Sequence, residues 1–194
     1  AVYGNAPELP KHEDMLPAPA SPYAAAKLAG EHLLRVHAEL YGLETVSLRY
    51  FNVFGPRQDA SSPYSGVISI FVDRALSGAT SAVFGDGEQS RDFVYVGDVA
   101  RANLLAAEVP AAAGRCYNIG TGQQTTLNQL LQVLGRLVGR TMPVDHAAPR
   151  AGDIRDSVAD IARARAELGY APEVSVEQGL ARLLEHVRRA RDGR

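Results

Sequence analysis

The chain reads SPYAAAKLAGEHLLRVHAELYGLETVSLRYF from Ser21 to Phe51, and this stretch decides the fold class. Ser21 stands where a helix N-cap belongs, Pro22 occupies the first helical position, and Gly42 supplies a C-terminal stop. Residues 44–51 then carry the β-branched and aromatic side chains typical of a strand. A helix followed by a crossover strand is half of a βαβ unit, so the sequence predicts an α/β fold with a parallel sheet.

The rest of the chain carries similar signals. Gly85-Asp86-Gly87 is a turn whose glycines permit positive φ, and leucines at helical spacing follow Thr126. Ser175 and Gln178 form a capping box. The expected elements are loops over 5–20 and 52–63, a helix over 67–76 that stops at Gly78, strands over 81–84 and 91–96, a helix over 98–109, a strand over 116–119, a helix from Thr126 to Gly139, a helix from Asp160 to Gly169, and a last helix after Ser175.

The composition is that of a globular protein. The 194 residues are 46% apolar, are 22% charged and contain no stretch near the roughly 18 apolar residues that a membrane span needs. The formal net charge of −2 gives no reason to expect nucleic acid or a membrane as a partner. The single cysteine, Cys116, and the lack of a signal-peptide pattern favour the cytoplasm. The five histidines show no metal-site spacing, so we expect no metal.

Tyr23 and Lys27 are the most informative pair of residues. They are four residues apart at the start of a capped helix, so the phenol and the ammonium project to one side. A free tyrosine has a pKa near 10, and action as a base near pH 7 needs a depression of about three units. A neighbouring lysine and the helix N-terminus both favour the phenolate. The spacing alone is common, however, and by itself favours a partly buried tyrosine beside a solvated lysine.

Several further motifs, in order along nearly the whole chain, narrow the interpretation. Together with the tyrosine and lysine they resemble the extended short-chain dehydrogenase/reductase family, and in particular its nucleotide-sugar epimerases and dehydratases. The motifs are Tyr3-Gly4, Ser21-Pro22-Tyr23 with Lys27, residues 48–57, Gly85-Asp86-Gly87, residues 90–96 with Asp98, residues 117–120, and Arg150 with Asp153. The resemblance implies the C-terminal part of an NAD(P)-binding Rossmann-like fold over residues 1–63. A smaller α/β substrate-binding domain is expected over 64–194, with some segments returning to the first domain.

The resemblance also implies a cofactor, NAD, and a role for each matching residue. Tyr23 matches the general base, and Lys27 matches the residue that lowers the pKa of that base and binds the nicotinamide ribose. Because the planar guanidinium of arginine can make two hydrogen bonds to phosphate, Arg91 and Arg150 suit the pyrophosphate positions that they match. The remaining matches are Phe51 and Val53 near the nicotinamide, Asn52 near the phosphates, Val67, Ala82, Val83 and Phe84 around uracil and ribose, Asp153 at the ribose hydroxyls, and Ser157 beside the sugar.

Ser157 bears on the choice of sugar. A small residue at this wall position leaves volume for an N-acetyl group, and residues 49–59 look most like the UDP-N-acetylglucosamine 4-epimerase branch. We therefore expect interconversion of UDP-GlcNAc and UDP-GalNAc, with UDP-glucose and UDP-galactose as possible substrates too. A sugar-nucleotide 4,6-dehydratase is the alternative within the enzyme class, and a non-catalytic nucleotide-sugar-binding module is the alternative outside it.

Some family features have no counterpart in these residues. The chain begins at Ala1 without an initiator methionine, and it contains no glycine-rich turn for the pyrophosphate of NAD. The family's catalytic serine or threonine falls upstream of Tyr3-Gly4. We therefore expect a fragment that is inactive by itself. In the family, the helix of Tyr23 joins a dimer interface, and the apolar residues that fit a homodimer here are Leu33, Leu34, Leu40 and Tyr41.

Overall fold

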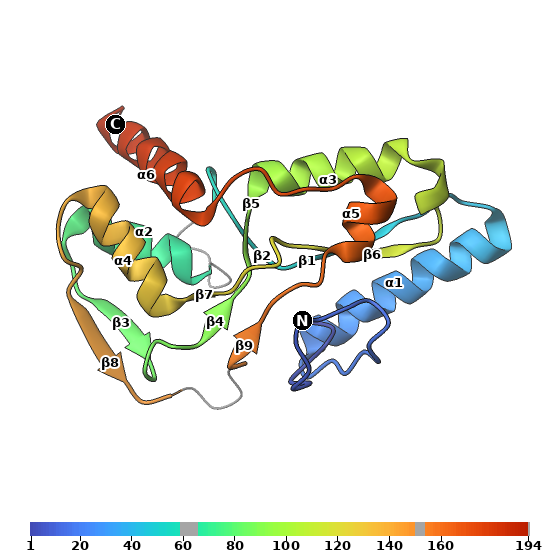
Figure 1. Cartoon of the computed structure of the whole chain (residues 1–194), viewed down its shortest axis with the longest axis horizontal. Helices are drawn as coiled ribbons and strands as arrows, with labels where there is room; N and C mark the ends of the chain where they lie inside the picture. Colours follow the sequence, from blue (N-terminus) through green and yellow to red (C-terminus); the bar gives the residue numbers. More distant parts are fainter. Residues whose placement is uncertain (59–65, 150–153, 194) are drawn as a thin grey trace.

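A computed structural model describes residues 1–58, 66–149 and 154–193 (Figure 1). The helices and strands alternate along the chain, as an α/β protein requires. In order they are α1 (Pro22–Tyr41), β1 (Ser47–Tyr50), β2 (Asn52–Phe54), α2 (Val67–Ser77), β3 (Ser81–Phe84), β4 (Ser90–Arg91), β5 (Phe93–Tyr95), α3 (Val96–Glu108), the 3-10 turn Pro110–Ala112, β6 (Cys116–Ile119), β7 (Thr125–Thr126), α4 (Leu127–Val138), β8 (Val144–Ala147), β9 (Asp156–Ser157), α5 (Ala162–Leu168) and α6 (Val176–Asp192).

The helix ends follow the local signals in the sequence. The Ser21 hydroxyl accepts a hydrogen bond from the Ala24 N–H at 3.2 Å, and Gly42 ends α1 in the left-handed conformation with φ 66°. Ser175 forms the predicted capping box with Gln178 on α6, and Thr126 forms a capping box on α4 that the sequence analysis did not predict. The Asp160 carboxylate accepts from the Ala162 N–H at 2.8 Å at the start of α5. These predicted helices are therefore confirmed.

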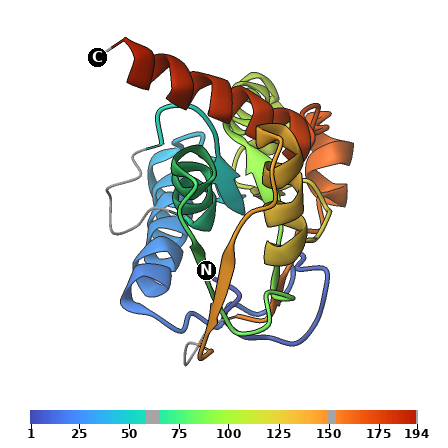
Figure 2. The same ribbon diagram turned by 90° about the vertical axis from the view of Figure 1, so that its left-hand side faces the viewer.

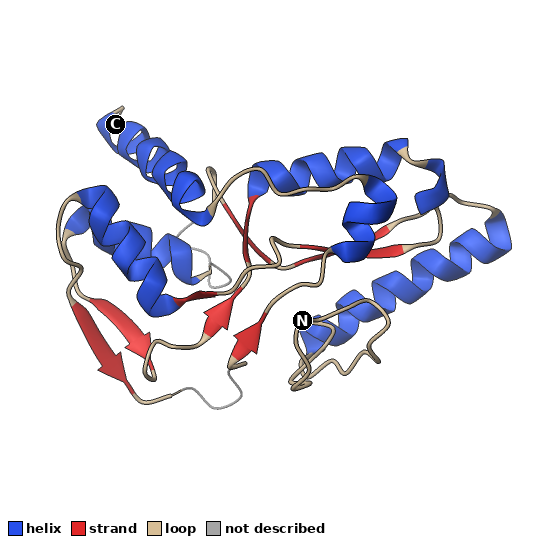
Figure 3. Ribbon diagram, viewed as in Figure 1, coloured by secondary structure: helices blue, strands red, loops and turns tan. Residues whose placement is uncertain are grey.

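Four strand pairs are parallel. β1 pairs with β6, β2 with β5, β3 with β8 and β4 with β9, whereas β4 and β7 are antiparallel. The predicted parallel sheet and α/β class are thus confirmed. Figure 3 shows the short strands between the helices, with β3 and β8 forming a separate ribbon. In Figure 1, α3 runs above the β1 and β6 strands and α1 runs below them.

Two of the expected strand and loop assignments are wrong, and one strand pair was missed. The loop expected from residue 52 begins instead with β2, because Asn52 and Val53 pair with Phe93 and Val94. The expected strand over 91–96 is divided between β4 and β5, which lie in different sheets. Strand β8 was not expected at all. It is exposed along its length and pairs with β3 some 60 residues earlier in the chain, so it carries no alternating apolar pattern.

The apolar residues form two main cores. One lies among α2, α4 and α6, and Figure 2 shows α6 lying across the other two helices. The second surrounds β6 and is covered by α3 and α5. The largest fully buried side chains are Tyr117, Tyr170, Phe71, Ile68 and Ile119. None of the helices that the structure describes is both long and apolar enough to cross a membrane.

Candidate functional site

A cavity of about 850 Å³ lies between the amino-terminal segment, α1, β1 and the chain around β9. Five of the residues that the sequence assigned to catalysis, cofactor or substrate line it together. They are Tyr23, Lys27, Phe51, Asn52 and Ser157. They come from three separate parts of the chain. The fold therefore brings together residues that the sequence analysis could relate to one another only through the family resemblance.

Tyr23 and Lys27 lie in the first two turns of α1. The Lys27 Nζ atom is 5.3 Å from the centroid of the Tyr23 ring, and the Tyr23 side chain is 61% exposed. The capped N-terminus of the helix adds a partial positive charge close to the phenol. This geometry gives an accessible phenol beside a cation, which is the arrangement that a tyrosine base needs.

The junction of β1 and β2 lies at the edge of the cavity. The Phe51 N–H donates to Ile119 O at 3.0 Å and the Asn52 N–H donates to Asp92 O at 2.9 Å, so the chain passes from one strand pair to the next here. Phe51 and Asn52 line the cavity. Val53 packs against the core around β6 and does not line the cavity.

The other predicted substrate residues lie away from this cavity. Val67 begins α2, and Ala82, Val83 and Phe84 form part of β3. Val83 is 1% exposed and belongs to the core, whereas Ala82 is exposed. Arg150 and Asp153 lie outside the described residues.

Arg91 is connected to the cavity through the sheet. It pairs in register with Ser157, which lines the cavity from the neighbouring strand β9. The Arg91 Nη1 atom donates to Ser90 O at 2.8 Å and to Arg155 O at 3.3 Å. The guanidinium is thus held beside the segment that leads into β9.

Asp92 is a buried anchor that the sequence analysis left without a role. Its carboxylate is 0% exposed and accepts hydrogen bonds from the N–H groups of Thr121, Gly122 and Ala159 at 2.8, 2.9 and 3.1 Å. The Thr121 hydroxyl donates to it as well, at 2.6 Å. Asp92 therefore fixes the turn after β6 and the residues that follow β9. The signal in the sequence that could have identified Asp92 is its position as a charged residue within an apolar run.

A second buried polar cluster connects three of the sequence motifs, namely Tyr3-Gly4, residues 48–57 and residues 117–120. The Tyr3 hydroxyl donates to Asn118 Oδ1 at 2.6 Å and accepts from Arg49 Nη1 at 2.9 Å. Burial raises the pKa of Tyr3 in spite of the nearby guanidinium. Burial lowers the pKa of Arg49, but its hydrogen bonds to Glu31 and Tyr3 outweigh that and raise the pKa overall. At physiological pH, Tyr3 is therefore a neutral phenol and Arg49 is a permanent cation.

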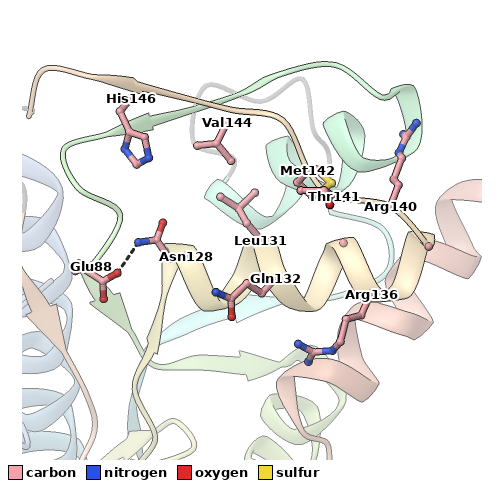
Figure 4. Close-up of a pocket in the computed structure, with 12 residues that line it drawn as sticks. Glu88, Asn128, Leu131, Gln132, Arg136, Arg140, Thr141, Met142, Val144 and His146 are labelled. Carbon is pink, nitrogen blue, oxygen red and sulfur yellow. Dashed lines mark hydrogen bonds between the residues drawn. The ribbon is translucent and has the colours of Figure 1, made fainter.

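A second cavity of about 850 Å³ opens between α4 and β8 (Figure 4). Leu131 and Met142 form its apolar floor, while Glu88 and Asn128 are hydrogen-bonded to each other at one end. None of the predicted site residues that the structure describes lines it. Of these two cavities, only the one next to α1 is lined by predicted site residues.

The described cavity fits the nicotinamide end of NAD. Phe51 presents an apolar ring and Lys27 an ammonium with hydrogen-bond donors, in a space of about 850 Å³. The 194 residues contain no glycine-rich strand-to-helix turn of the kind that holds a dinucleotide pyrophosphate. The fit therefore concerns one end of the cofactor.

Comparison with known proteins supports the assignment of these motifs. The model of the NAD dependent epimerase/dehydratase family matches residues 1–120. A UDP-glucose 4-epimerase of Mycolicibacterium smegmatis is 42% identical over 188 residues, which are 97% of this chain and 59% of the relative.

Solved structures are similar as well, and two of them illustrate this. The UDP-glucose 4-epimerase of Thermotoga maritima, solved with UDP-glucose, matches with a TM-score of 0.93 and 44% identity over 98% of this chain and 61% of that one. A UDP-N-acetylglucosamine 4-epimerase from Methanobrevibacter ruminantium, in complex with UDP-N-acetylmuramic acid, matches with a TM-score of 0.92 and 39% identity. This match covers 97% of this chain and 60% of that one. The chain thus spans about three fifths of the length of these relatives.

Proposed function

Because the chain belongs to the NAD-dependent epimerase/dehydratase family, with its Rossmann-like α/β fold, we propose that it carries the catalytic tyrosine and the sugar-binding residues of a UDP-sugar 4-epimerase. The observation that carries this proposal is the cavity that brings Tyr23 and Lys27 together with Asn52 and Ser157. The names of the similar proteins point to the same reaction.

Tyr23 acts on the hydroxyl at C4 of the sugar. Its phenolate takes the proton from that oxygen while the C4–H bond breaks, and a 4-keto sugar results. NAD, held at its nicotinamide end by Lys27 and Phe51, would supply the hydride acceptor for C4 and the hydride donor for the return. Once the keto sugar has turned over in the cavity, Tyr23 gives the proton back to the oxygen at C4. Atoms and electrons balance over the cycle, and only the configuration at C4 changes.

Lys27 stabilises the phenolate form of Tyr23. Its ammonium lies 5.3 Å from the centre of the Tyr23 ring, close enough for a favourable interaction with a phenolate in a partly enclosed cavity. The same ammonium has further donors available for the nicotinamide ribose. Phe51 provides an apolar surface for the nicotinamide.

The sugar is chosen beside Ser157. The side chain of Ser157 is half-buried and lines the same cavity as Tyr23, so its small size leaves room next to the reacting sugar. We propose that an N-acetyl group occupies this room and that UDP-GlcNAc and UDP-GalNAc are substrates. UDP-glucose and UDP-galactose, which are smaller, fit the same space.

The remaining contacts to the cofactor come from outside these residues. Since the sequence has no glycine-rich turn, we propose that another part of the enzyme binds the pyrophosphate and adenosine of NAD. For experiments, residues 1–194 can be joined to the part of the Thermotoga maritima relative that this chain does not cover. We call this protein the joined enzyme.

The exposed face of α1 suits a second subunit. Leu33, Leu40 and Tyr41 are 60%, 69% and 74% exposed, which is unusual for residues of this size on one helix. We propose that the complete enzyme forms a homodimer through α1. Size-exclusion chromatography of the joined enzyme should give a dimer, and a monomer would contradict this part of the proposal.

The Ser157→Tyr variant tests the sugar assignment. In the joined enzyme it should abolish turnover of UDP-GlcNAc while UDP-glucose is still converted, because the phenol fills the space beside the sugar. Ser157→Ala is the matched control and should leave both rates nearly unchanged. An unchanged ratio of the two rates in Ser157→Tyr would contradict the assignment, and release of a 4-keto-6-deoxy sugar would indicate the dehydratase instead.

A further inference from the structure

An ion pair lies on the same face of α1 as the proposed catalytic residues. Glu31 follows Lys27 by four residues and Tyr23 by eight, so the three side chains lie along one side of the helix. The Glu31 carboxylate is bound by Arg49 of β1 through Nε at 2.9 Å and Nη2 at 2.7 Å. The Arg49 and Glu31 side chains are only 10% and 18% exposed. This is a bidentate, largely buried pair, the strongest geometry for such a contact.

Arg49 is itself held in place on its other side. Its Nη1 donates to the Tyr3 hydroxyl at 2.9 Å, and its guanidinium carbon lies 5.0 Å from the centre of the Tyr3 ring. The Tyr3 hydroxyl in turn donates to Asn118, which is 0% exposed. The guanidinium therefore has a fixed position between the amino-terminal segment and α1.

Lys27 and Glu31 would otherwise be natural partners. Opposite charges four residues apart on a helix attract each other. A Lys27 paired with Glu31 would turn away from Tyr23, and the carboxylate would leave a negative charge on the face where the phenolate has to form. In the structure, Lys27 Nζ lies over the Tyr23 ring, and no ion pair joins Lys27 to Glu31 within the described part of the chain.

We infer that Arg49 is a positioning residue for Lys27: it sequesters the Glu31 carboxylate, so that the ammonium of Lys27 stays beside Tyr23. This inference rests on the proposed function, because it concerns the environment of the proposed base. Arg49 and Glu31 line the same cavity as Tyr23, and the inferred role of Arg49 is exerted through Glu31 and Lys27.

Other ionisable groups around the pair do not replace this role. Cys116 Sγ lies 4.0 Å from Glu31 Oε2, and burial raises the pKa of this thiol to about 11, so it stays neutral. Tyr3 is neutral because burial raises its pKa. Glu13 lies 3.9 Å from Arg163 and accepts from the Asn118 N–H, so it is already compensated. The Glu31 carboxylate is therefore the negative charge on this face of α1 that Arg49 binds and neutralises.

Three variants of the joined enzyme separate positioning from mere support of the fold. In Arg49→Met, the rising limb of the pH profile of kcat/KM should move to higher pH by about 0.5–1 unit, because Lys27 is drawn to the freed carboxylate. In the double variant Glu31→Gln/Arg49→Met, the limb should return to the wild-type position. Arg49→Lys keeps the charge but loses the planar fork, so a smaller shift is expected.

A structural role predicts a different pattern. If Arg49 only braced α1, the double variant would be no better than Arg49→Met, and the limb would stay in place while the activity and melting temperature fell together. Either result would overturn the inference. Arg49→Lys covers the case in which Arg49→Met does not fold.

A second measurement does not depend on activity. The tyrosinate absorbance of the 194-residue chain, taken as the difference from its Tyr23→Phe variant, gives the midpoint of Tyr23 ionisation. Arg49→Met should move this midpoint up by about 0.5–1 pH unit and the double variant should restore it. An unmoved midpoint contradicts the inference, whereas a wild-type joined enzyme that converts no UDP-sugar contradicts the proposed function instead.

Discussion

Tyr23 carries the chemistry of the proposed reaction. Tyr23→Phe removes the group that accepts the proton, so kcat of the joined enzyme should fall by about 10²–10⁴-fold while UDP-sugar binding is retained. Tyr95→Phe is a matched control, since Tyr95 lies in β5, away from the proposed dimer face of α1, and does not line the cavity. A near-normal rate for Tyr23→Phe, measured by steady-state kinetics, would exclude it as the base.

Cys116 should be an unreactive thiol. Burial raises its pKa to about 11, so the reactive thiolate is scarce at pH 8. Compared with an ordinary cysteine of pKa near 8.5, the folded chain should react with iodoacetamide about 200-fold more slowly at pH 8. Since the folded pKa is raised, the rate should climb with each pH unit up to about 11. Mass spectrometry of the chain follows this directly, and fast labelling of folded protein would contradict the burial.

Only part of the site could be predicted from individual residues. The pairing of Tyr23 with Lys27 is local, because helix geometry alone places them on one face. The contact between Glu31 and Arg49 depends instead on how α1 packs against β1, and nothing near either residue in the sequence indicates it. Ser157 was placed beside the sugar by resemblance to the family, and the structure adds that it shares a cavity with Tyr23.

At the scale of elements, α6 packs closely against β2 and β5 through one glycine. A Cβ atom at Gly179 would lie 2.6 Å from Phe54 Cζ and 3.0 Å from Tyr95 Cδ2, and Phe54 is only 2% exposed and so has no room to move. Gly179→Ala should therefore cost about 1–3 kcal/mol of unfolding free energy.

Gly30→Ala is the control for this prediction. Gly30 is also helical, but nothing among the described residues lies within 4 Å of its added Cβ. Alanine has the higher helix propensity, so this variant should gain about 0.5–1 kcal/mol. Urea denaturation measures both variants. Similar free energies for the two would show that α6 does not pack as described.

The elements differ in how well the sequence predicts them, because some are fixed by neighbouring residues and others by residues far away in the sequence. Helices α1, α4 and α6 are marked by side chains that cap their own backbone, so their limits are written locally. Strands β2 and β8 have three and four residues, and their partners come from far along the chain. Strand pairing of that kind leaves no periodic pattern in so short a segment.

At the scale of the whole molecule, strands from the beginning of the chain pair with strands from later in it. Strands β1 and β2 come from the first 63 residues, yet they pair with β6 and β5. We propose that these later segments belong to the same cofactor-binding unit as α1, while α2, β3, α4 and α6 build the unit that holds the uridine. The arrangement places the cavity with Tyr23 and Ser157 beside β1.

The most direct test is the interconversion of UDP-GlcNAc and UDP-GalNAc. The joined enzyme, shown by fluorescence to bind the nicotinamide cofactor, should convert either sugar to the equilibrium mixture, as followed by NMR of the sugar protons. The 194-residue chain alone should give no conversion, because it lacks the glycine-rich turn for the cofactor. A folded, cofactor-binding joined enzyme that converts neither these sugars nor UDP-glucose would contradict the central claim, as would conversion by the chain alone without NAD.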